Sequence, residues 1–167
     1  MKIVGICASP RKGNSELALK ILLDSTKQKG AEINLVLLRN FNIGFVGTKK
    51  KDDFDKKILP RIVGADALIF ASPVYYDMVS PQLLNLIDRL DPHANLMKNK
   101  NLGVILCGTA SFRSSGKNAV DYLERVAEIY NMKFIGYVFG RVEKAGEIAK
   151  DKNTISKLRK FGAKLVK

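Results

Sequence analysis

The chain has 167 residues, of which 46% are hydrophobic and 27% are charged. This composition excludes a disordered chain, and the length predicts one domain over residues 1–167. No apolar run approaches the ~20 residues that a bilayer span requires, so a membrane protein is not expected. The 29 lysines and arginines exceed the 16 aspartates and glutamates, which gives a net charge of +13. That charge fits a nucleic acid, an acidic or phosphorylated partner, or a lysine-rich proteome.

The two cysteines, Cys7 and Cys107, lie in or beside apolar runs, where a thiol behaves as a small hydrophobic group. They are too few for a disulfide framework or for a four-thiolate cluster. Free thiols, together with an N-terminus that shows no signal peptide, predict a cytoplasmic protein.

Apolar runs alternate with amphipathic runs along the chain. The predicted strands are 2–8, 32–38, 67–71, 102–107 and 133–139. The predicted helices are 15–29, a segment that carries Phe54, Ile58 and Ile62, and then 81–90, 116–131 and 151–164. Gly30 is expected to end the first helix, and Pro60 either kinks the second helix or marks a later start for it.

Strands that are apolar on both faces belong to parallel sheets covered by helices on each side. Five strands alternating with five helices therefore predict an α/β fold, a three-layer doubly wound parallel sheet with strand order 2-1-3-4-5. Right-handed crossovers bring the loops after the first, third and fourth strands to one edge, where such sheets bind ligands. We therefore expect the functional site in residues 9–15, 72–80 and 108–115.

The first of these loops, residues 9–15, reads SPRKGNS and leads directly into a helix. Unpaired N–H groups and the positive end of the helix dipole favour an anion at this place. The spacing matches neither the dinucleotide fingerprint nor the Walker A loop. A phosphate of another ligand is therefore predicted, and plain helix capping by Asn14 or Ser15 is the alternative.

Two segments resemble one known family. Residues 7–15 (CASPRKGNS) are similar to the loop G-S-P-R-x-x-(S/G)-N-(S/T) of the NADPH-dependent FMN reductases and iron–sulfur flavoproteins, which are flavodoxin-like. Residues 72–83 (SPVYYDMVSPQL) with 87–89 (IDR) resemble their second loop and the helix after it. The resemblance implies bound FMN, with its phosphate on the first loop, its ring and ribityl chain on the second, and its pyrimidine end beside the third. The cofactor-binding residues that it implies are Ser9, Arg11, Lys12, Asn14, Ser15, Pro73, Val74, Tyr75, Tyr76, Gly108 and Thr109.

Some of these residues allow a simpler interpretation. Tyr75 and Tyr76 would also suit a helix cover or a subunit contact, since aromatic residues are common in interfaces. Asp88 and Arg89 match the family's helix pair, and we expect them to serve an ion pair or a subunit contact.

The sequence departs from the iron–sulfur flavoproteins after the second strand. Those proteins carry four cysteines there, whereas residues 39–53 contain none. Without thiolates we expect no iron–sulfur cluster, and we predict no other metal site. The apolar loop at residues 41–46 is expected instead to wall the flavin or to contact a neighbouring subunit.

The resemblance implies an FMN-dependent NAD(P)H oxidoreductase that passes hydride from a nicotinamide to the flavin and on to a small-molecule or protein acceptor. Hydride transfer requires alignment of the two rings, so no catalytic side chain is expected. The resemblance further implies a homodimer or homotetramer. The first alternative is an FMN-binding electron-transfer carrier without nicotinamide turnover. The second is a nucleic-acid binder, which the charge motivates but no recognised module supports.

Overall fold

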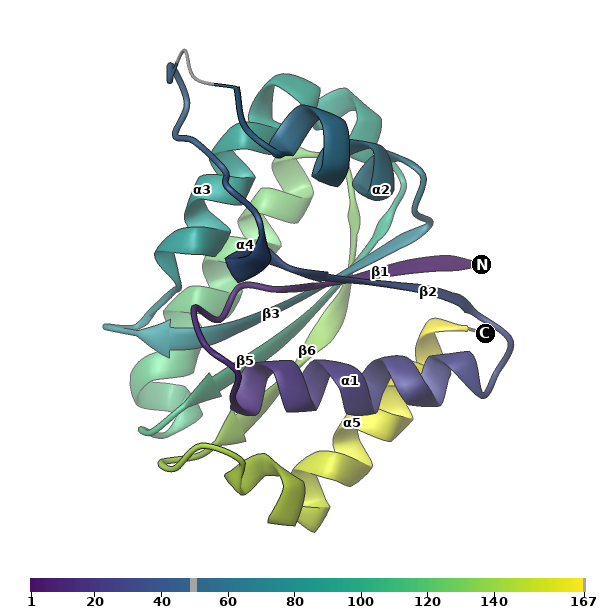
Figure 1. Cartoon of the computed structure of the whole chain (residues 1–167). Helices are drawn as coiled ribbons and strands as arrows, with labels where there is room; N and C mark the ends of the chain where they lie inside the picture. Colours follow the sequence, from purple (N-terminus) through teal and green to yellow (C-terminus); the bar gives the residue numbers. More distant parts are fainter. Residues whose placement is uncertain (49–50, 167) are drawn as a thin grey trace.

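A five-stranded parallel sheet forms the centre of the computed structural model, which describes residues 1–48 and 51–166 (Figure 1). Its strand order is β2-β1-β3-β5-β6, and a short strand, β4, pairs antiparallel with β3. The strands are β1 (Lys2–Cys7), β2 (Glu32–Leu37), β3 (Ala67–Tyr75), β4 (Met78–Val79), β5 (Asn101–Gly108) and β6 (Lys133–Arg141). The predicted fold class is confirmed. The predicted order 2-1-3-4-5 is also confirmed, because β5 and β6 are the fourth and fifth strands of the parallel sheet and β4 is an additional short strand.

Helices cover both faces of the sheet (Figure 1). On one face lie α1 (Asn14–Lys27) and α5 (Lys152–Leu165), and on the other lie α2 (Leu59–Val63), α3 (Pro81–Leu90) and α4 (Lys117–Ile129). The strands must therefore be apolar on both sides. In β1, Ile3 packs into the core beneath α1 and α5, while Val4 packs into the opposite core. No helix in the described ranges is long and apolar enough to cross a membrane.

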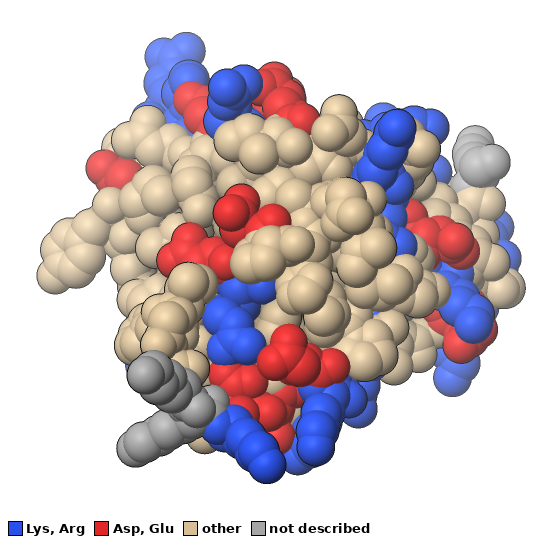
Figure 2. All heavy atoms as spheres, turned by 90° about the horizontal axis from the view of Figure 1, so that it is seen from above, with Lys and Arg blue, Asp and Glu red and all other residues tan. Residues whose placement is uncertain are grey.

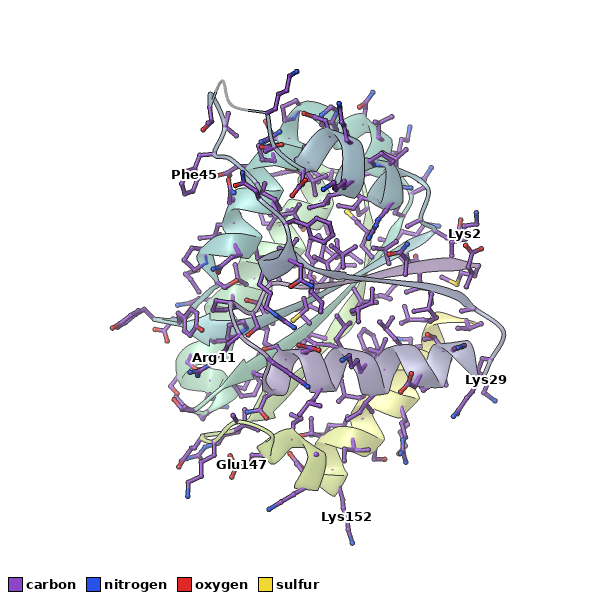
Figure 3. The ribbon with its side chains drawn as sticks, in the orientation of Figure 1. Lys2, Arg11, Lys29, Phe45, Glu147 and Lys152 are labelled. Atoms are coloured by element: carbon purple, nitrogen blue, oxygen red, sulfur yellow. The ribbon has the colours of Figure 1, made fainter. Side chains whose placement is uncertain are left out.

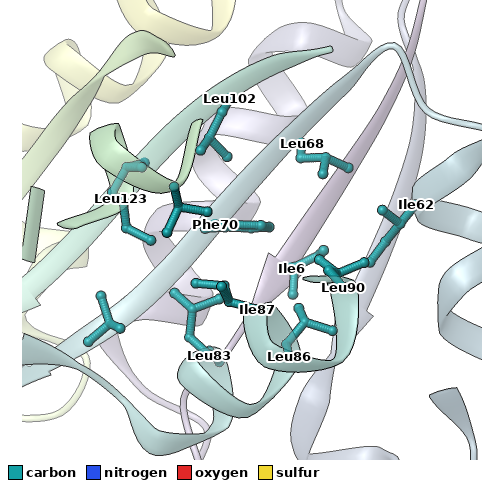
Figure 4. Close-up of a cluster of buried hydrophobic side chains, with 14 of the residues drawn as sticks. Ile6, Ile62, Leu68, Phe70, Leu83, Leu86, Ile87, Leu90, Leu102 and Leu123 are labelled. Atoms are coloured by element: carbon teal, nitrogen blue, oxygen red, sulfur yellow. The ribbon is translucent and has the colours of Figure 1, made fainter. Parts of the chain in front are cut away.

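The core on the α3 side shows how helix periodicity builds the fold (Figure 4). Leu83, Leu86 and Leu90 recur at helical spacing, so they lie on one face of α3, and all three are buried. This face packs in the same cluster as Phe70 of β3 and Leu123 of α4. Burial of these large side chains fixes α3, which is the helix that follows the β3–β4 hairpin.

Two boundaries differ from the prediction. The third strand continues to Tyr75 instead of ending at residue 71. Its pairing with β5 extends to Pro73, which lies opposite Cys107, and Val74 and Tyr75 then pair with β4. The second predicted helix is a π-helical segment, Phe54–Ile58, followed by α2 with Pro60 in its first turn. The later helix start is therefore confirmed, since proline lacks only an N–H that a first turn leaves unpaired.

The loop between β2 and α2 is closed by a buried carboxylate. Lys49 and Lys50, within the predicted 41–53 loop, lie outside the described residues. Asp52 accepts hydrogen bonds from the N–H groups of Gly44 (2.8 Å) and Phe54 (3.0 Å) and forms an ion pair with Arg89. Burial raises the pKa of Asp52, but these three donors outweigh it and hold the pKa below its ordinary value. The predicted ion-pair role of Arg89 is confirmed.

Replacing Asp52 by asparagine is expected to lower the free energy of unfolding by about 2 kcal/mol at pH 7, because Arg89 loses its buried counter-charge. The lowered pKa makes this stabilisation complete above the ordinary aspartate pKa of about 4, and it is lost as the pH falls through the folded value. Urea unfolding of D52N should therefore show a flatter acid limb than that of the wild type. The control is D55N, because Asp55 is 67% exposed and pairs with the same arginine. Equal unfolding of the two variants would contradict the prediction.

Candidate functional site

The carboxyl ends of β1, β3 and β5 meet at one edge of the sheet, on the left in Figure 1. Two hydrogen bonds hold the first two ends together. The Ala8 N–H donates to the Ala71 carbonyl (2.8 Å), and the buried Ser80 hydroxyl donates to the Ala8 carbonyl (2.7 Å). The loops after β1 and β3 are therefore neighbours, although more than 60 residues separate them in the chain.

A pocket of about 120 Å³ opens at this edge. Of the eleven predicted residues, nine line it: Ser9, Arg11, Asn14, Ser15, Pro73, Val74, Tyr75, Gly108 and Thr109. Lys12 and Tyr76 are exposed and do not belong to the lining. The sequence thus correctly predicted that three separate loops meet at one cavity, but it did not predict which of their side chains point away from it.

The N-terminus of α1 forms the first wall of the pocket. Gly13 occupies the position before the helix, and neither Asn14 nor Ser15 caps α1 with its side chain. The capping alternative is therefore wrong, and the first-turn N–H groups keep their capacity to donate to a ligand. The Ser9 hydroxyl donates to the Arg11 carbonyl (2.7 Å), which fixes the turn before the helix. Arg11 itself adds positive charge to the lining (Figure 3).

Glu16 brings a negative charge into the first turn of α1, and two cations neutralise it. Its carboxylate is buried and pairs with Lys20 (2.7 Å) and Arg39 (2.8 Å). Burial raises the pKa of Glu16, but these two hydrogen-bonded cations hold it below the ordinary value. The helix N-terminus therefore remains suited to an anion.

Cys107 lies at the floor of the pocket. Burial raises the pKa of Cys107 to about 12. A thiol with this pKa stays protonated at neutral pH and is a poor nucleophile. Cys7 is also free and buried, so the interpretation of both cysteines as small hydrophobic residues is confirmed.

The β3–β4 hairpin forms a second wall. Pairing of β3 with β5 ends at Pro73, whereas Val74 and Tyr75 pair only with β4. The edge of β3 that β5 leaves uncovered borders the pocket, because Val74 and Tyr75 both line it. At the tip, Tyr76 and Asp77 have φ angles of 47° and 65°, a left-handed conformation that costs energy in residues other than glycine.

The connection between β6 and α5 forms a third wall that the sequence reasoning missed. Val142, Glu143 and Ala145 line the pocket, and the Val142 N–H donates to the Gly108 carbonyl (2.8 Å). Topology carried a signal for this wall, because the fifth parallel strand must also end at this edge. Its residues, however, have no distinctive chemistry in sequence.

A metal site was not expected, and the described ranges contain no group of three or more histidine, cysteine, aspartate or glutamate side chains placed to hold a metal ion. The absence of an iron–sulfur cluster remains a prediction.

Residues 1–146 match the family model described as NADPH-dependent FMN reductase. The chain belongs to this family. It is therefore a flavodoxin-like flavoprotein and an oxidoreductase, and the pocket lies where a doubly wound sheet binds its ligand.

Individual relatives agree with this assignment. The chain is 32% identical to an iron–sulfur flavoprotein of Archaeoglobus fulgidus, over 99% of this chain and 79% of that protein. It is 31% identical to a Bacillus subtilis protein named as an NAD(P)H-dependent FMN-containing oxidoreductase, over 64% of this chain and 63% of that protein. A solved structure titled NADH:FMN oxidoreductase, in its apo form, superposes with a TM-score of 0.80 at 18% identity, over 99% of this chain and 88% of that chain.

The strained hairpin tip leads to a stability prediction. Replacing Tyr76 by glycine is expected to raise the free energy of unfolding by about 0.5–1 kcal/mol, because glycine adopts φ 47° without strain and the fully exposed ring packs on nothing. The matched control is Tyr75→Gly in β3, which is expected to destabilise by about 1 kcal/mol. Thermal and urea unfolding of both variants tests this, and a Tyr76→Gly protein less stable than wild type would contradict it.

Proposed function

We propose that this protein is an FMN-dependent NAD(P)H oxidoreductase whose pocket holds the phosphate and ribityl chain of FMN. One observation carries the proposal: the uncapped N-terminus of α1 and Arg11 open into the same cavity as the uncovered edge of β3. The first feature suits a phosphate and the second suits a flat, partly apolar ring. Membership of the NADPH-dependent FMN reductase family supports the same cofactor.

The phosphate end has a defined set of donors. The first-turn N–H groups of α1 and the Arg11 guanidinium would bind the phosphate, while Ser9 holds the loop in shape. The Ser15 hydroxyl would add a further donor, because Ser15 also lines the pocket. Lys12 is exposed, and its contribution would be long-range attraction only.

The ring end is open. Sites that enclose a whole cofactor-sized molecule usually measure about 300–1,000 Å³, so a cavity of about 120 Å³ fits only part of FMN. The ring would then lie along Val74 and Tyr75 and beside Gly108 and Thr109, with one face uncovered. FMN, when bound, supplies hydride and electron transfer. The chain contributes orientation of the ring and an exposed face for the nicotinamide.

The open ring face and the exposed hairpin also support association. Tyr76 is fully exposed at the tip and Tyr75 is 38% exposed, so a second copy of the chain would cover aromatic surface and complete the site, in a homodimer or homotetramer. The electron acceptor would be a small molecule or a protein. The apolar 41–46 segment does not line the pocket, and its exposed Phe45 and Val46 would contact the neighbouring subunit, without a cluster.

The face shown in Figure 2 gives no support to a nucleic-acid partner. On the face shown in Figure 2, cations are interspersed with acidic residues and form no broad basic stripe of the kind that tracks a phosphate backbone. We also infer that the protein works in the cytoplasm, where the buried free thiols Cys7 and Cys107 are stable.

Arg11→Ala is expected to weaken FMN binding by about ten- to a hundredfold, because a charge-assisted contact to the phosphate is lost. Riboflavin, which lacks the phosphate, should bind the variant and the wild type equally. Lys12→Ala is the control and should change FMN affinity by no more than about twofold. Fluorescence titration measures both flavins, and an equal loss for FMN and riboflavin would contradict a phosphate contact.

Anaerobic mixing of the FMN-loaded protein with NADPH, and separately with NADH, is expected to bleach the flavin absorbance as hydride is transferred. Rapid-scan absorbance spectroscopy measures the rate with each nicotinamide. Bound FMN that neither nicotinamide reduces would remove the reductase assignment and leave the electron carrier. A protein that takes up no FMN would overturn the proposal as a whole.

A further inference from the structure

Both ends of the Asn14 carboxamide are engaged with a distant segment of the chain. Its Nδ2 donates to the Lys144 carbonyl (2.8 Å), and its Oδ1 accepts from the Ile148 N–H (3.2 Å). Asn14 is the first residue of α1, whereas Lys144 and Ile148 belong to the connection between β6 and α5. The side chain therefore links the first wall of the pocket, at the N-terminus of α1, to the third wall.

That third wall, residues 142–148, is anchored at its two ends but has little apolar packing between them. Val142 at one end and Ile148 at the other are buried, but Glu143, Lys144 and Ala145 between them are exposed. The position of the residues between these two ends therefore depends on hydrogen bonds rather than on apolar packing.

The hydrogen bonds inside the segment close it on itself. The Glu147 carboxylate accepts from the N–H groups of Glu143 (2.7 Å) and Lys144 (3.0 Å), and the Glu147 N–H donates to the Lys144 carbonyl (3.3 Å). Glu147 and Arg11 lie at the same edge of the molecule (Figure 3). These bonds give the segment a shape, while the Asn14 side chain connects that shape to α1.

We propose that Asn14 is a positioning residue that tethers residues 142–148 as a wall of the flavin pocket, and so sets how long FMN stays bound. The proposal rests on the proposed function, because it takes FMN as the occupant. With its oxygen and one of its amide hydrogens engaged by the backbone, Asn14 acts on the cofactor through the wall. Phosphate recognition is left to Arg11, Ser15 and the first-turn N–H groups.

The expected consequence is kinetic. A wall that is already in place needs no ordering when the flavin binds, and a released wall opens a path for the flavin to leave. Changes at one binding surface act mostly on the dissociation rate and little on the association rate. Loss of the tether should therefore shorten the residence time of FMN.

Asn14→Ala is expected to speed FMN release about tenfold, because two hydrogen bonds to the wall are lost, while the association rate stays within about twofold. Exchange of isotopically labelled FMN out of the loaded protein into an excess of unlabelled FMN measures the release rate. Asn14→Asp keeps an acceptor for Ile148 but loses the donor to Lys144, so its release rate should be intermediate. Asn153→Ala, at an exposed asparagine of α5, is the matched control and should leave the rate unchanged.

Two further readouts separate positioning from direct phosphate binding. In Asn14→Ala, riboflavin and FMN affinities should fall by the same factor, in contrast to Arg11→Ala, which affects FMN alone. Hydrogen exchange of the FMN-free variant should speed up at residues 143–148 and stay unchanged in the rest of α1.

An unchanged release rate, or a loss of FMN affinity without loss of riboflavin affinity, would overturn the proposal. Unchanged hydrogen exchange at residues 143–148 would show that Asn14 does not tether this segment. A wild-type protein that binds no FMN would overturn the proposed function instead, and the exchange comparison in FMN-free protein would then decide alone whether Asn14 tethers the segment.

Discussion

The site depends on the buried hydroxyl of Ser80. It donates to the Ala8 carbonyl at the end of β1 and accepts from the Leu83 N–H in the first turn of α3, while the Ser80 N–H donates to the Ser72 hydroxyl of β3. One small residue thus caps α3, closes the β3–β4 hairpin and holds the carboxyl end of β1 against it. Because every partner is buried or part-buried, breaking any of these hydrogen bonds would leave a polar group without a replacement bond to water, which is energetically unfavourable.

The walls of the pocket differ in how they are stabilised. The sheet edge is fixed by cores on both faces, whereas the hairpin tip carries backbone strain at Tyr76. The 142–148 wall has buried ends, but the stretch between them is held by side-chain hydrogen bonds. The strands thus place one part of the pocket lining on rigid elements, and the less stable segments supply the rest. This division is common in binding sites on loops that a rigid scaffold positions.

Charge in this protein is arranged locally. At the α1 N-terminus, the Glu16 carboxylate is neutralised by Lys20 and Arg39, which leaves the helix dipole available to an anion. Asp52 of the 41–53 loop forms a buried ion pair with Arg89 of α3. The net charge of +13 is the sum of such arrangements and many exposed lysines, and by itself it did not identify a partner.

The sequence alone determined the parallel sheet, its strand order and the three loops at its edge, because apolar runs and helix periodicity report local burial along the chain. It also carried the family's two loop motifs, and through them most of the pocket lining. Only the tertiary structure decided that Tyr76 points to solvent and that Asn14 reaches Lys144, 130 residues away. Such contacts depend on where two folded elements come to lie relative to each other, and no local pattern records that placement.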